Sequence, residues 1–268
     1  MSRCSFCIDP SCNGKQNCDC TTCNSKDTCH RVLHPIVRIT TRCTQSCFHC
    51  AFECSPQKTD MMDIETANKV RIFIEQNSIH YIGIMGGEFF LNPDWYTIVD
   101  ILAEGVTVRL TSNGDWAAFP YISEKFVEIC KKHPGIVVAI SYDKWHTNKN
   151  VEKASKILSD ANIAHKVAKY SDMTDDSIVP IGRKLFEPGF YSSIGTYCSK
   201  PCSRYTFLIK EGGEICKCPF GLYEYDFVHN FQENKFHARF KDFGEKFRKV
   251  CFMTCRECVR YHDKYLGE

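Results

Sequence analysis

The chain reads IVRITTRCTQSCFHC over residues 36–50, and this stretch decides the fold. Residues 36–39 form a mostly apolar run of strand type, and Cys43, Cys47 and Cys50 follow it. A CxxxCxxC array can hold three corners of a [4Fe–4S] cube, because cysteine thiolates at short sequence spacings bind cluster irons. The fourth iron is then open to a ligand that is not protein, and an open metal position is typical of catalytic sites.

Cysteine is the one extreme of the composition, with 19 residues in a chain of 268. Seven lie between Cys4 and Cys29 and seven between Cys198 and Cys258, while Cys54 follows the central trio. The first residues show no apolar signal segment, so a secreted disulfide framework is not indicated. In a reducing compartment, iron–sulfur clusters and other metal sites explain so many thiols best. We therefore expect a cytoplasmic protein.

The charge and hydropathy of the chain exclude two broad classes of partner. The formal net charge is +2, which does not indicate a polyanionic partner such as nucleic acid. No apolar run approaches the roughly 18 residues that a membrane helix needs. We therefore expect neither a membrane nor a nucleic acid as the main partner.

The hydrophobic pattern predicts three regions: a cysteine-rich metal-binding module at residues 1–34, a βα-alternating domain at residues 35–185, and a cysteine-rich domain at residues 186–268. In the middle region, strands are expected at residues 36–40, 79–85, 106–111, 136–141, 165–169 and 178–181, and helices at about 60–76, 94–104, 121–132 and 151–160. Short apolar strands separated by amphipathic helices favour a parallel sheet in an α/β fold. Six such units favour a partial or full barrel over an open sheet.

Local patterns complete this picture. Residues 206–209 and 215–217 flank a glycine turn and predict a β-hairpin. The last helix is expected to pack through a stripe at helical spacing, made of Phe236, Phe240, Phe243 and Phe247. Cys130 is aligned with Ile122 and Phe126 at helical spacing, which predicts a buried thiol that packs as a small apolar residue.

Three further polar segments each follow a predicted strand. Gly86-Gly87-Glu88 comes after the second strand, Ser112-Asn113 ends the third, and Ser141-Tyr142-Asp143 ends the fourth. Barrels of the α/β class place their reactive groups on the loops after the strands, and glycines let a backbone approach a ligand closely. Among the histidines, His146 is nearest this expected active rim.

Together with the cysteine trio, these segments resemble the radical S-adenosylmethionine (radical SAM) superfamily in kind and in order. The resemblance covers about 150 residues and implies a partial (β/α)6 TIM-type barrel. It implies that Cys43, Cys47 and Cys50 hold a [4Fe–4S] cluster whose free iron is chelated by SAM. Residues 179–183, VPIGR, resemble a segment of members with extra clusters.

The resemblance also implies SAM contacts for particular residues. Gly86, Gly87 and Glu88 would bind its amino group, Ser112 and Asn113 would lie near its carboxylate and ribose, and Ser141 and Asp143 would lie near SAM or the substrate. His49 stands where the family usually has an aromatic residue whose backbone touches adenine. Phe89 follows the glycine motif where the family usually has proline, which puts only the detail of that loop in doubt.

The implied reaction is reductive cleavage of SAM to methionine and a 5′-deoxyadenosyl radical, which abstracts hydrogen from a substrate. A reductase, a flavodoxin or a ferredoxin would supply the electron. A peptide leads among the substrates, and a nucleotide-derived or other small molecule is the alternative. From another class, a non-catalytic iron–sulfur electron carrier stays open. Cys54 and Pro56 extend the trio to CxxxCxxCxxxCxP, a ferredoxin-type run in which a fourth thiolate would close the cube.

The C-terminal cysteines resemble the auxiliary-cluster extensions called SPASM and twitch domains. One auxiliary [4Fe–4S] cluster would take Cys202, Cys216, Cys255 and Cys258, and a second would take Cys198, Cys218 and Cys251. Zinc is the alternative, because CxxC spacing suits it equally.

The N-terminal cysteines align with no family segment, and they predict either zinc or a further cluster. The ligands would be drawn from Cys4, Cys7, Cys12, Cys18, Cys20, Cys23 and Cys29, with His30 as an extra ligand.

Overall fold

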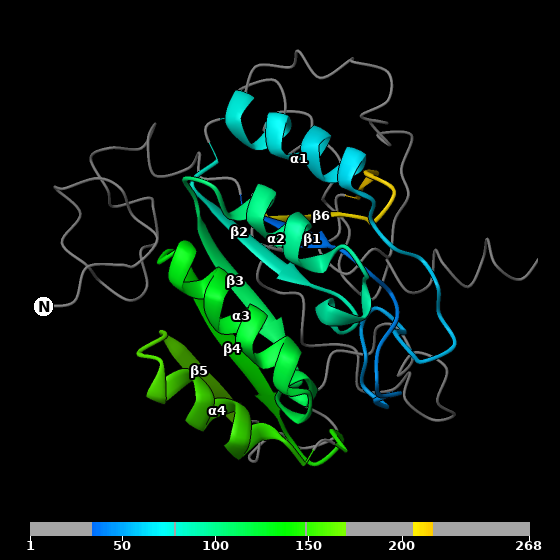
Figure 1. Ribbon diagram of the computed structural model, residues 1–268. Helices are drawn as coiled ribbons and strands as arrows, with labels where there is room; N and C mark the ends of the chain where they lie inside the picture. Colours follow the sequence, from blue (N-terminus) through cyan, green and yellow to red (C-terminus); the bar gives the residue numbers. More distant parts are fainter. Residues whose placement is uncertain (1–33, 78, 148, 170–205, 217–268) are drawn as a thin grey trace, which may run out of the picture.

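The computed structural model describes residues 34–77, 79–147, 149–169 and 206–216 (Figure 1). Five strands alternate with four helices: β1 His34–Arg38, α1 Ile64–Gln76, β2 Tyr81–Met85, α2 Trp95–Ala103, β3 Thr107–Ser112, α3 Pro120–Lys132, β4 Ile136–Tyr142, α4 Val151–Asp160 and β5 His165–Lys169. A hairpin of β6 Thr206–Ile209 and β7 Ile215–Cys216 completes the described elements. The expected alternation and the expected hairpin are both confirmed.

All seven strands belong to one sheet, in the order β5-β4-β3-β2-β1-β6-β7. Every neighbouring pair is parallel except β6 and β7. The β6 strand lies beside β1, where Val37 pairs with Ile209 on one side and with Ile84 on the other. The parallel α/β class is therefore confirmed. The expected strand at residues 178–181 and the phenylalanine stripe lie outside the described residues.

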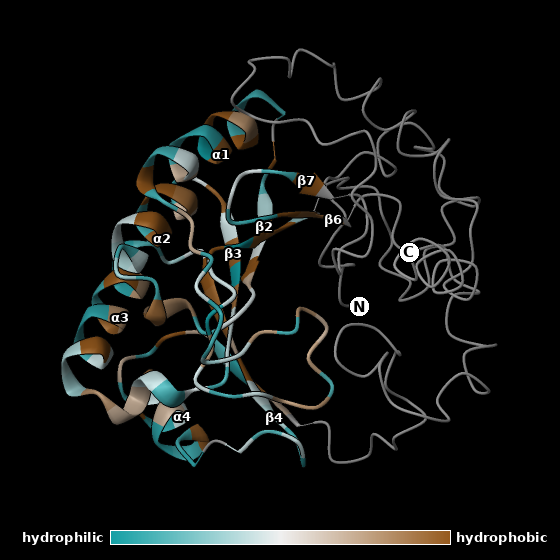
Figure 2. Ribbon diagram, turned by 90° about the vertical axis from the view of Figure 1, so that its right-hand side faces the viewer, coloured by the Kyte–Doolittle hydropathy of each residue, from teal (hydrophilic) through white to brown (hydrophobic). Residues whose placement is uncertain are grey.

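Helices α1 to α4 cover one face of this sheet, and their hydrophobic sides turn toward it (Figure 2). Aromatic rings fill part of that layer, with Phe126 at 4.7 Å from Trp116 and 4.9 Å from Phe89 between ring centroids. Cys130 of α3 is 4 % exposed within the same core, as expected. Burial raises the pKa of its thiol to about 12, so it packs as an apolar group.

Several element boundaries differ from the sequence-based expectation by one to four residues, and hydrogen bonds explain two of these differences. The first strand ends at Arg38 rather than at residue 40, because the carbonyls of Ile39 and Thr40 accept hydrogen bonds from Met62 and Gly87 outside the sheet. Helix α1 begins at Ile64 because the Asp63 carboxylate caps it, accepting the Thr66 N–H at 2.7 Å.

Candidate SAM and cluster site

The loops that carry the predicted motifs all leave the sheet at one edge. Because β1 to β4 are parallel, their carboxyl ends meet at the same end of the sheet (Figure 1). The cysteine loop follows β1, the glycine motif follows β2, and the polar segments follow β3 and β4. The fold therefore gathers four motifs that lie up to 100 residues apart in the chain.

Cys43, Cys47 and Cys50 are partly buried, and their thiols lie near enough to interact electrostatically. Burial is the largest cause that raises the pKa of Cys43 to about 12, and Glu88, Cys47 and Cys50 raise it further. A thiol with such a pKa keeps its proton at neutral pH until a metal replaces it. This donor set suits a cluster, because cationic irons supply the charge that three neighbouring thiolates need.

Cys54 lies behind the trio and is 1 % exposed. Its backbone N–H points to Cys50 Sγ at 3.3 Å, while its own thiol donates to the Phe52 carbonyl oxygen at 3.7 Å. A hydrogen bond between the Cys54 and Cys50 side chains, together with burial, raises the pKa of the Cys54 thiol far above its ordinary value. Cys54 therefore supports the loop through an N–H···S contact, of the kind that tunes cluster thiolates.

Gly86 and Gly87 are needed for contact with the cysteine loop itself. The N–H of Gly87 donates to the Thr40 carbonyl and the N–H of Glu88 donates to the Arg42 carbonyl, each at 2.8 Å. A Cβ on Gly87 would lie 1.9 Å from the Arg42 oxygen. Gly86 has a φ of 138°, a value that side chains rarely allow. The glycines thus fasten the second loop to the residues just before Cys43.

The Glu88 side chain joins the second loop to the third. Its two oxygens accept from the Ser112 hydroxyl and from the Asn113 N–H, each at 2.8 Å. Burial raises the pKa of Glu88 to about 8, although these hydrogen bonds oppose the rise. The Asn113 amide in turn donates to the Thr44 hydroxyl at 2.9 Å. The expected SAM-binding residues on these two loops therefore form one network around the cysteine loop.

Asp115 is a central residue that the sequence did not reveal. Its carboxylate accepts from Thr44 at 2.6 Å, from Gln45 at 3.1 Å and from Asn150 at 3.1 Å. It therefore ties the cysteine loop to the N-terminus of α4. An acidic residue after Gly114 was the only local signal, and nothing nearby in the sequence indicates its three partners.

The fourth loop meets the cysteine loop at His49. The Asp143 carboxylate lies 3.3 Å from His49 Nε2 and 2.8 Å from His146 Nδ1. Burial favours the neutral acid, but His146 and His49 outweigh it and hold the pKa of Asp143 well below its usual range. Ser141 lies two residues earlier, within β4, paired with Ala168 of β5. His146 thus joins the site, as its position near the rim suggested.

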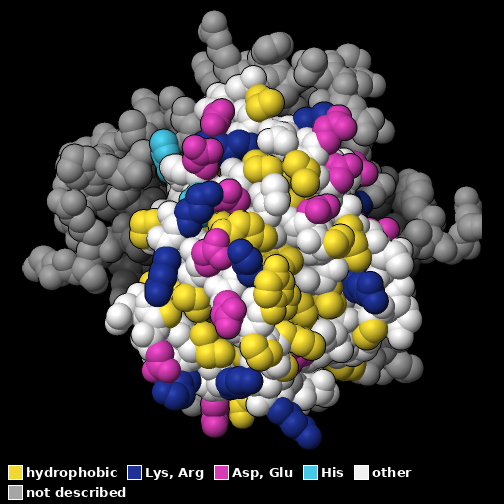
Figure 3. Space-filling model, viewed as in Figure 1, with side chains coloured by type: hydrophobic (Ala, Val, Ile, Leu, Met, Phe, Trp, Pro, Cys, Tyr) yellow, Lys and Arg dark blue, Asp and Glu magenta, His cyan; other side chains and the backbone are white. Residues whose placement is uncertain are grey.

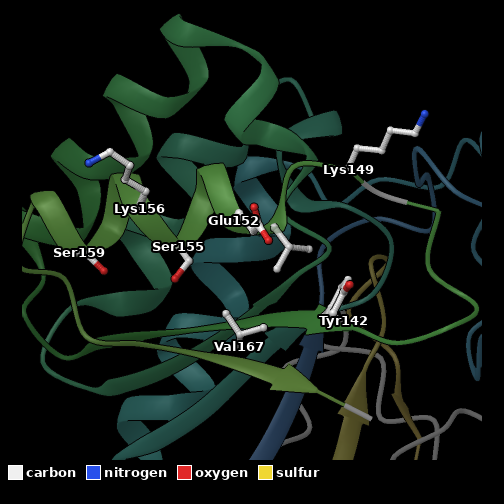
Figure 4. Close-up of a pocket in the computed structure, with 8 residues that line it drawn as sticks. Tyr142, Lys149, Glu152, Ser155, Lys156, Ser159 and Val167 are labelled. Atoms are coloured by element: carbon white, nitrogen blue, oxygen red, sulfur yellow. The ribbon is translucent and has the colours of Figure 1, made fainter. Parts of the chain in front are cut away.

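A separate hollow of about 600 Å³ lies between α4 and the ends of β4 and β5 (Figure 4). Ser155, Ser159 and Val167 line it, with Tyr142 at one end. None of the predicted cluster or SAM residues lines this hollow. The predicted cluster and SAM residues therefore lie outside this hollow.

The residues present fit a cluster and SAM. Three thiols without disulfides stand beside backbone N–H groups and polar side chains, and Thr111 Oγ1 is buried without a hydrogen-bond partner. Of the remaining predicted metal ligands, Cys216 lies in β7. The other C-terminal cysteines and all the N-terminal cysteines lie outside the described residues.

Two curated relatives are similar in sequence. YydG of Bacillus subtilis, a protein named for peptide biosynthesis, is 28 % identical over 53 % of this chain. AlbA of Bacillus subtilis, named for biosynthesis of the antilisterial bacteriocin subtilosin, is 29 % identical over 51 % of this chain. This chain covers 48 % of YydG and 32 % of AlbA, so it spans at most about half the length of these relatives.

A solved structure and a family model extend the comparison. The crystal structure of BtrN in complex with AdoMet and 2-DOIA matches with a TM-score of 0.55 at 15 % identity, covering 81 % of this chain and 87 % of BtrN. At this identity the likeness concerns the fold. The model of the Radical SAM superfamily matches residues 37–173, which include the cysteine trio and the loops after β1 to β4, and the expected partial barrel of this superfamily is thereby confirmed. With that match, and with its motifs gathered at one edge of the sheet, the chain belongs to the radical SAM superfamily.

Proposed function

We propose that this protein is a radical SAM enzyme that abstracts hydrogen from a peptide during peptide maturation. The observation that carries the proposal is the hydrogen-bonded network that joins Cys43–Cys50 to Glu88 and Asn113 at the carboxyl ends of the strands. The names of YydG and AlbA support the peptide. The family implies a [4Fe–4S] cluster and SAM, which together supply a 5′-deoxyadenosyl radical when bound.

In this proposal, each part of the site has a distinct task. Cys43, Cys47 and Cys50 hold the cluster and leave one position for SAM. The backbone of Gly86 and Gly87 faces the amino group of SAM, while the Glu88 carboxyl, committed to Ser112 and Asn113, holds the two loops together. The protein thus orients SAM and keeps water from the reactive carbon.

The remaining parts of the proposal concern the outer regions and the partners. The C-terminal cysteines would hold one or two auxiliary clusters, and those of residues 1–34 would hold zinc or a further cluster. A flavodoxin, a ferredoxin or a reductase would deliver the electron, which fits a reducing cytoplasmic compartment. The described residues contain no helix long and apolar enough to cross a membrane.

The charge on the visible face does not favour a nucleic-acid substrate. Over the helices of the described region, Lys and Arg side chains alternate with Asp and Glu side chains (Figure 3). A surface that tracks a phosphate backbone needs a stripe of positive charge instead. The mixed face agrees with a peptide or small-molecule substrate.

The first test concerns the reaction itself. The full chain, reconstituted anaerobically with iron and sulfide, would receive SAM and dithionite, and 5′-deoxyadenosine would be measured by mass spectrometry. We expect the wild type to form 5′-deoxyadenosine. The variants Cys43→Ala, Cys47→Ala and Cys50→Ala should not form it, whereas the matched control Cys130→Ala should. A reconstituted wild type that neither binds SAM nor forms the product would instead support the electron-carrier hypothesis.

The second test separates a peptide from a small molecule. Cells that make the protein would be grown in deuterated medium, and their extract would be separated by size and added to the reconstituted enzyme. Hydrogen abstraction then transfers one deuterium to 5′-deoxyadenosine. We expect labelling from the peptide fraction that protease treatment abolishes. Labelling from the small-molecule fraction alone, resistant to protease, would contradict the peptide proposal and leave the radical SAM reaction intact.

A further inference from the structure

The loops after β1 and β4 bring three metal-binding side chains together. His49, Asp143 and His146 each offer a donor atom, and these atoms all lie within 4.8 Å of one another. The Asp143 side chain is 1 % exposed, and those of His49 and His146 are 22 % and 12 % exposed. Two imidazoles and one carboxylate therefore converge in a largely buried place, beside the cysteine loop but with no cysteine among them.

The spacing of the donors suits a shared ion. Bonds of about 2.1 Å set neighbouring donors roughly 3.0 Å apart in an octahedral shell and roughly 3.4 Å apart in a tetrahedral one. Asp143 Oδ2 lies 3.3 Å from His49 Nε2, and Asp143 Oδ1 lies 2.8 Å from His146 Nδ1. Little movement is therefore needed to place an ion between the three side chains.

Hydrogen bonding leaves part of this arrangement unexplained. His146 Nδ1 is buried and has no hydrogen-bond partner, although it lies only 2.8 Å from a carboxylate oxygen. In a hydrogen bond the ring N–H points at the oxygen, whereas two ligands of one ion both point at the ion instead. His49 presents Nε2, and not its buried Nδ1, to Asp143. The buried Nδ1 of His146 is therefore the nitrogen that points to a ligand other than a proton.

The surroundings of Asp143 match those of a metal-binding carboxylate. Its Oδ1 accepts the backbone N–H groups of Trp145 and His146 at 2.9 and 3.0 Å, which fixes the carboxylate and leaves Oδ2 toward His49. The Trp145 ring packs on His49 at 5.0 Å between centroids. Such outer contacts orient metal ligands. The ion-pair contacts of Asp143 run to the two histidines, His49 and His146, so a cation held by all three side chains would balance its charge.

We propose that His49, Asp143 and His146 bind one divalent first-row transition-metal ion, Fe²⁺ or Zn²⁺, beside the SAM cluster. Two imidazoles and a carboxylate are the ligand set of non-haem Fe²⁺ sites and of open zinc sites. The ion joins the cysteine loop to the loop after β4. Its binding does not depend on the identity of the substrate or on the cleavage of SAM.

Mn²⁺ is the probe that tests this site. Manganese prefers nitrogen and oxygen ligands to thiolates, so the many cysteines of the chain compete weakly for it. The full chain would be reconstituted with iron and sulfide, treated with a chelator to remove Fe²⁺ that is not in clusters, desalted, and then titrated anaerobically with Mn²⁺. The electron paramagnetic resonance signal of aqueous Mn²⁺ reports the unbound ion, and pulsed measurements detect imidazole nitrogen bound to it.

The expected result is one bound Mn²⁺ per chain, with nitrogen coupling, in the wild type. His146→Ala and Asp143→Asn should weaken its binding by more than about tenfold, as the loss of a ligand or of its charge requires. His133→Ala is the matched control and should bind Mn²⁺ as the wild type does. The His133 side chain is 13 % exposed, and its Nε2 lies 2.6 Å from Asp100 Oδ1. It therefore forms a partly buried histidine–aspartate pair like that of Asp143, but with a single histidine.

Two outcomes would overturn the proposal. One is a wild type that binds no Mn²⁺ with nitrogen coupling, and the other is binding that His146→Ala and Asp143→Asn leave unchanged. The absorbance of the clusters would be recorded for every variant, so that a loss of folding is separated from a loss of the ion. Because the readout uses neither SAM nor a substrate, a negative Mn²⁺ result does not contradict the proposed radical SAM function. Likewise, a lack of SAM cleavage does not contradict the proposed metal site.

Discussion

Glu88 accepts the hydroxyl hydrogen bond of Ser112 at 2.8 Å, and both residues are almost completely buried. This contact crosses from the loop after β2 to the end of β3. It makes the acidic residue of the Gly86-Gly87-Glu88 segment into a structural link. Ser112 Oγ also accepts the N–H of Gly114 at 2.9 Å, so the link continues into the next turn. The consequences for stability can be measured.

Glu88 should make the protein less stable as the pH rises. Burial raises its pKa from 4.5 to about 8. Between these values the folded chain holds a proton that the unfolded chain has lost, so this contribution to stability is complete below pH 4.5 and is lost as the pH rises through 8. The slope approaches about 1.4 kcal/mol per pH unit.

The Glu88→Gln variant tests this prediction, because its amide resembles the protonated acid. Urea denaturation between pH 5 and pH 9, at equal cluster content, should give a flatter profile for the variant. The variant should also be the more stable form at pH 9. Identical slopes for the two proteins would show that Glu88 does not titrate in this range.

Gly87→Ala should disrupt the cluster site. The new methyl carbon would lie 1.9 Å from the Arg42 carbonyl oxygen. Because that oxygen belongs to the backbone, it can move away only at a large cost in free energy. We expect a loss of stability of about 2 kcal/mol or more, together with loss of SAM cleavage. Gly83→Ala is the control and should keep both stability and SAM cleavage, because its Cβ would meet Ile36 Cγ1 at 3.7 Å and the Pro35 carbonyl oxygen at 4.0 Å, which are ordinary contacts. Equal activity of the two variants would contradict the role given to Gly87.

The buried ion pair between Arg38 and Glu211 should contribute strongly to stability. Glu211 accepts from Arg38 at 2.7 and 3.1 Å, and the two side chains are 10 % and 13 % exposed. Glu211→Ala leaves a buried guanidinium without its partner, so unfolding should cost about 3 kcal/mol less.

Asp160→Ala is the control for that variant, since Asp160 pairs with Lys156 on the exposed side of α4. Its loss should leave the urea midpoint unchanged. A similar small shift for both variants would mean that the hairpin is held to β1 by backbone pairing alone.

Much of the fold follows from the sequence because its signals are local. The bounds of α4 and β5 match the expected ranges, since amphipathic spacing and short apolar runs identify them without reference to the rest of the chain. The pairing of β6 with β1 could not be predicted, because the hairpin pattern identifies its own turn and not its neighbouring strand, whose paired residues are 172 positions away. Long-range pairing depends on tertiary contacts that a single sequence does not show.

The candidate site also has residues that local sequence motifs predict and residues that they do not. Cys43, Gly87 and Asn113 belong to short motifs, so their positions were predictable. Asp115 was not, because its partners Thr44 and Asn150 are 71 and 35 residues distant. The purpose of Gly87 was predicted only in part: the expected close approach exists, but it is made to the backbone of Arg42.

Cys54→Ala should keep the SAM cluster and its reaction, whereas Cys50→Ala should lose both. The thiol of Cys54 donates to the Phe52 carbonyl and is also hydrogen-bonded to the Cys50 side chain, and the backbone N–H of Cys54 separately reaches Cys50 Sγ. Alanine keeps that N–H, so the cluster ligand Cys50 keeps the hydrogen bond from it.

A cube closed by a fourth thiolate would behave differently: Cys54→Ala would open an iron, and SAM binding would appear or increase in the variant. The electron paramagnetic resonance spectrum of the reduced protein, recorded with and without SAM, distinguishes these outcomes. We expect SAM to change the spectrum equally in the wild type and in Cys54→Ala, because three thiolates already leave one iron open.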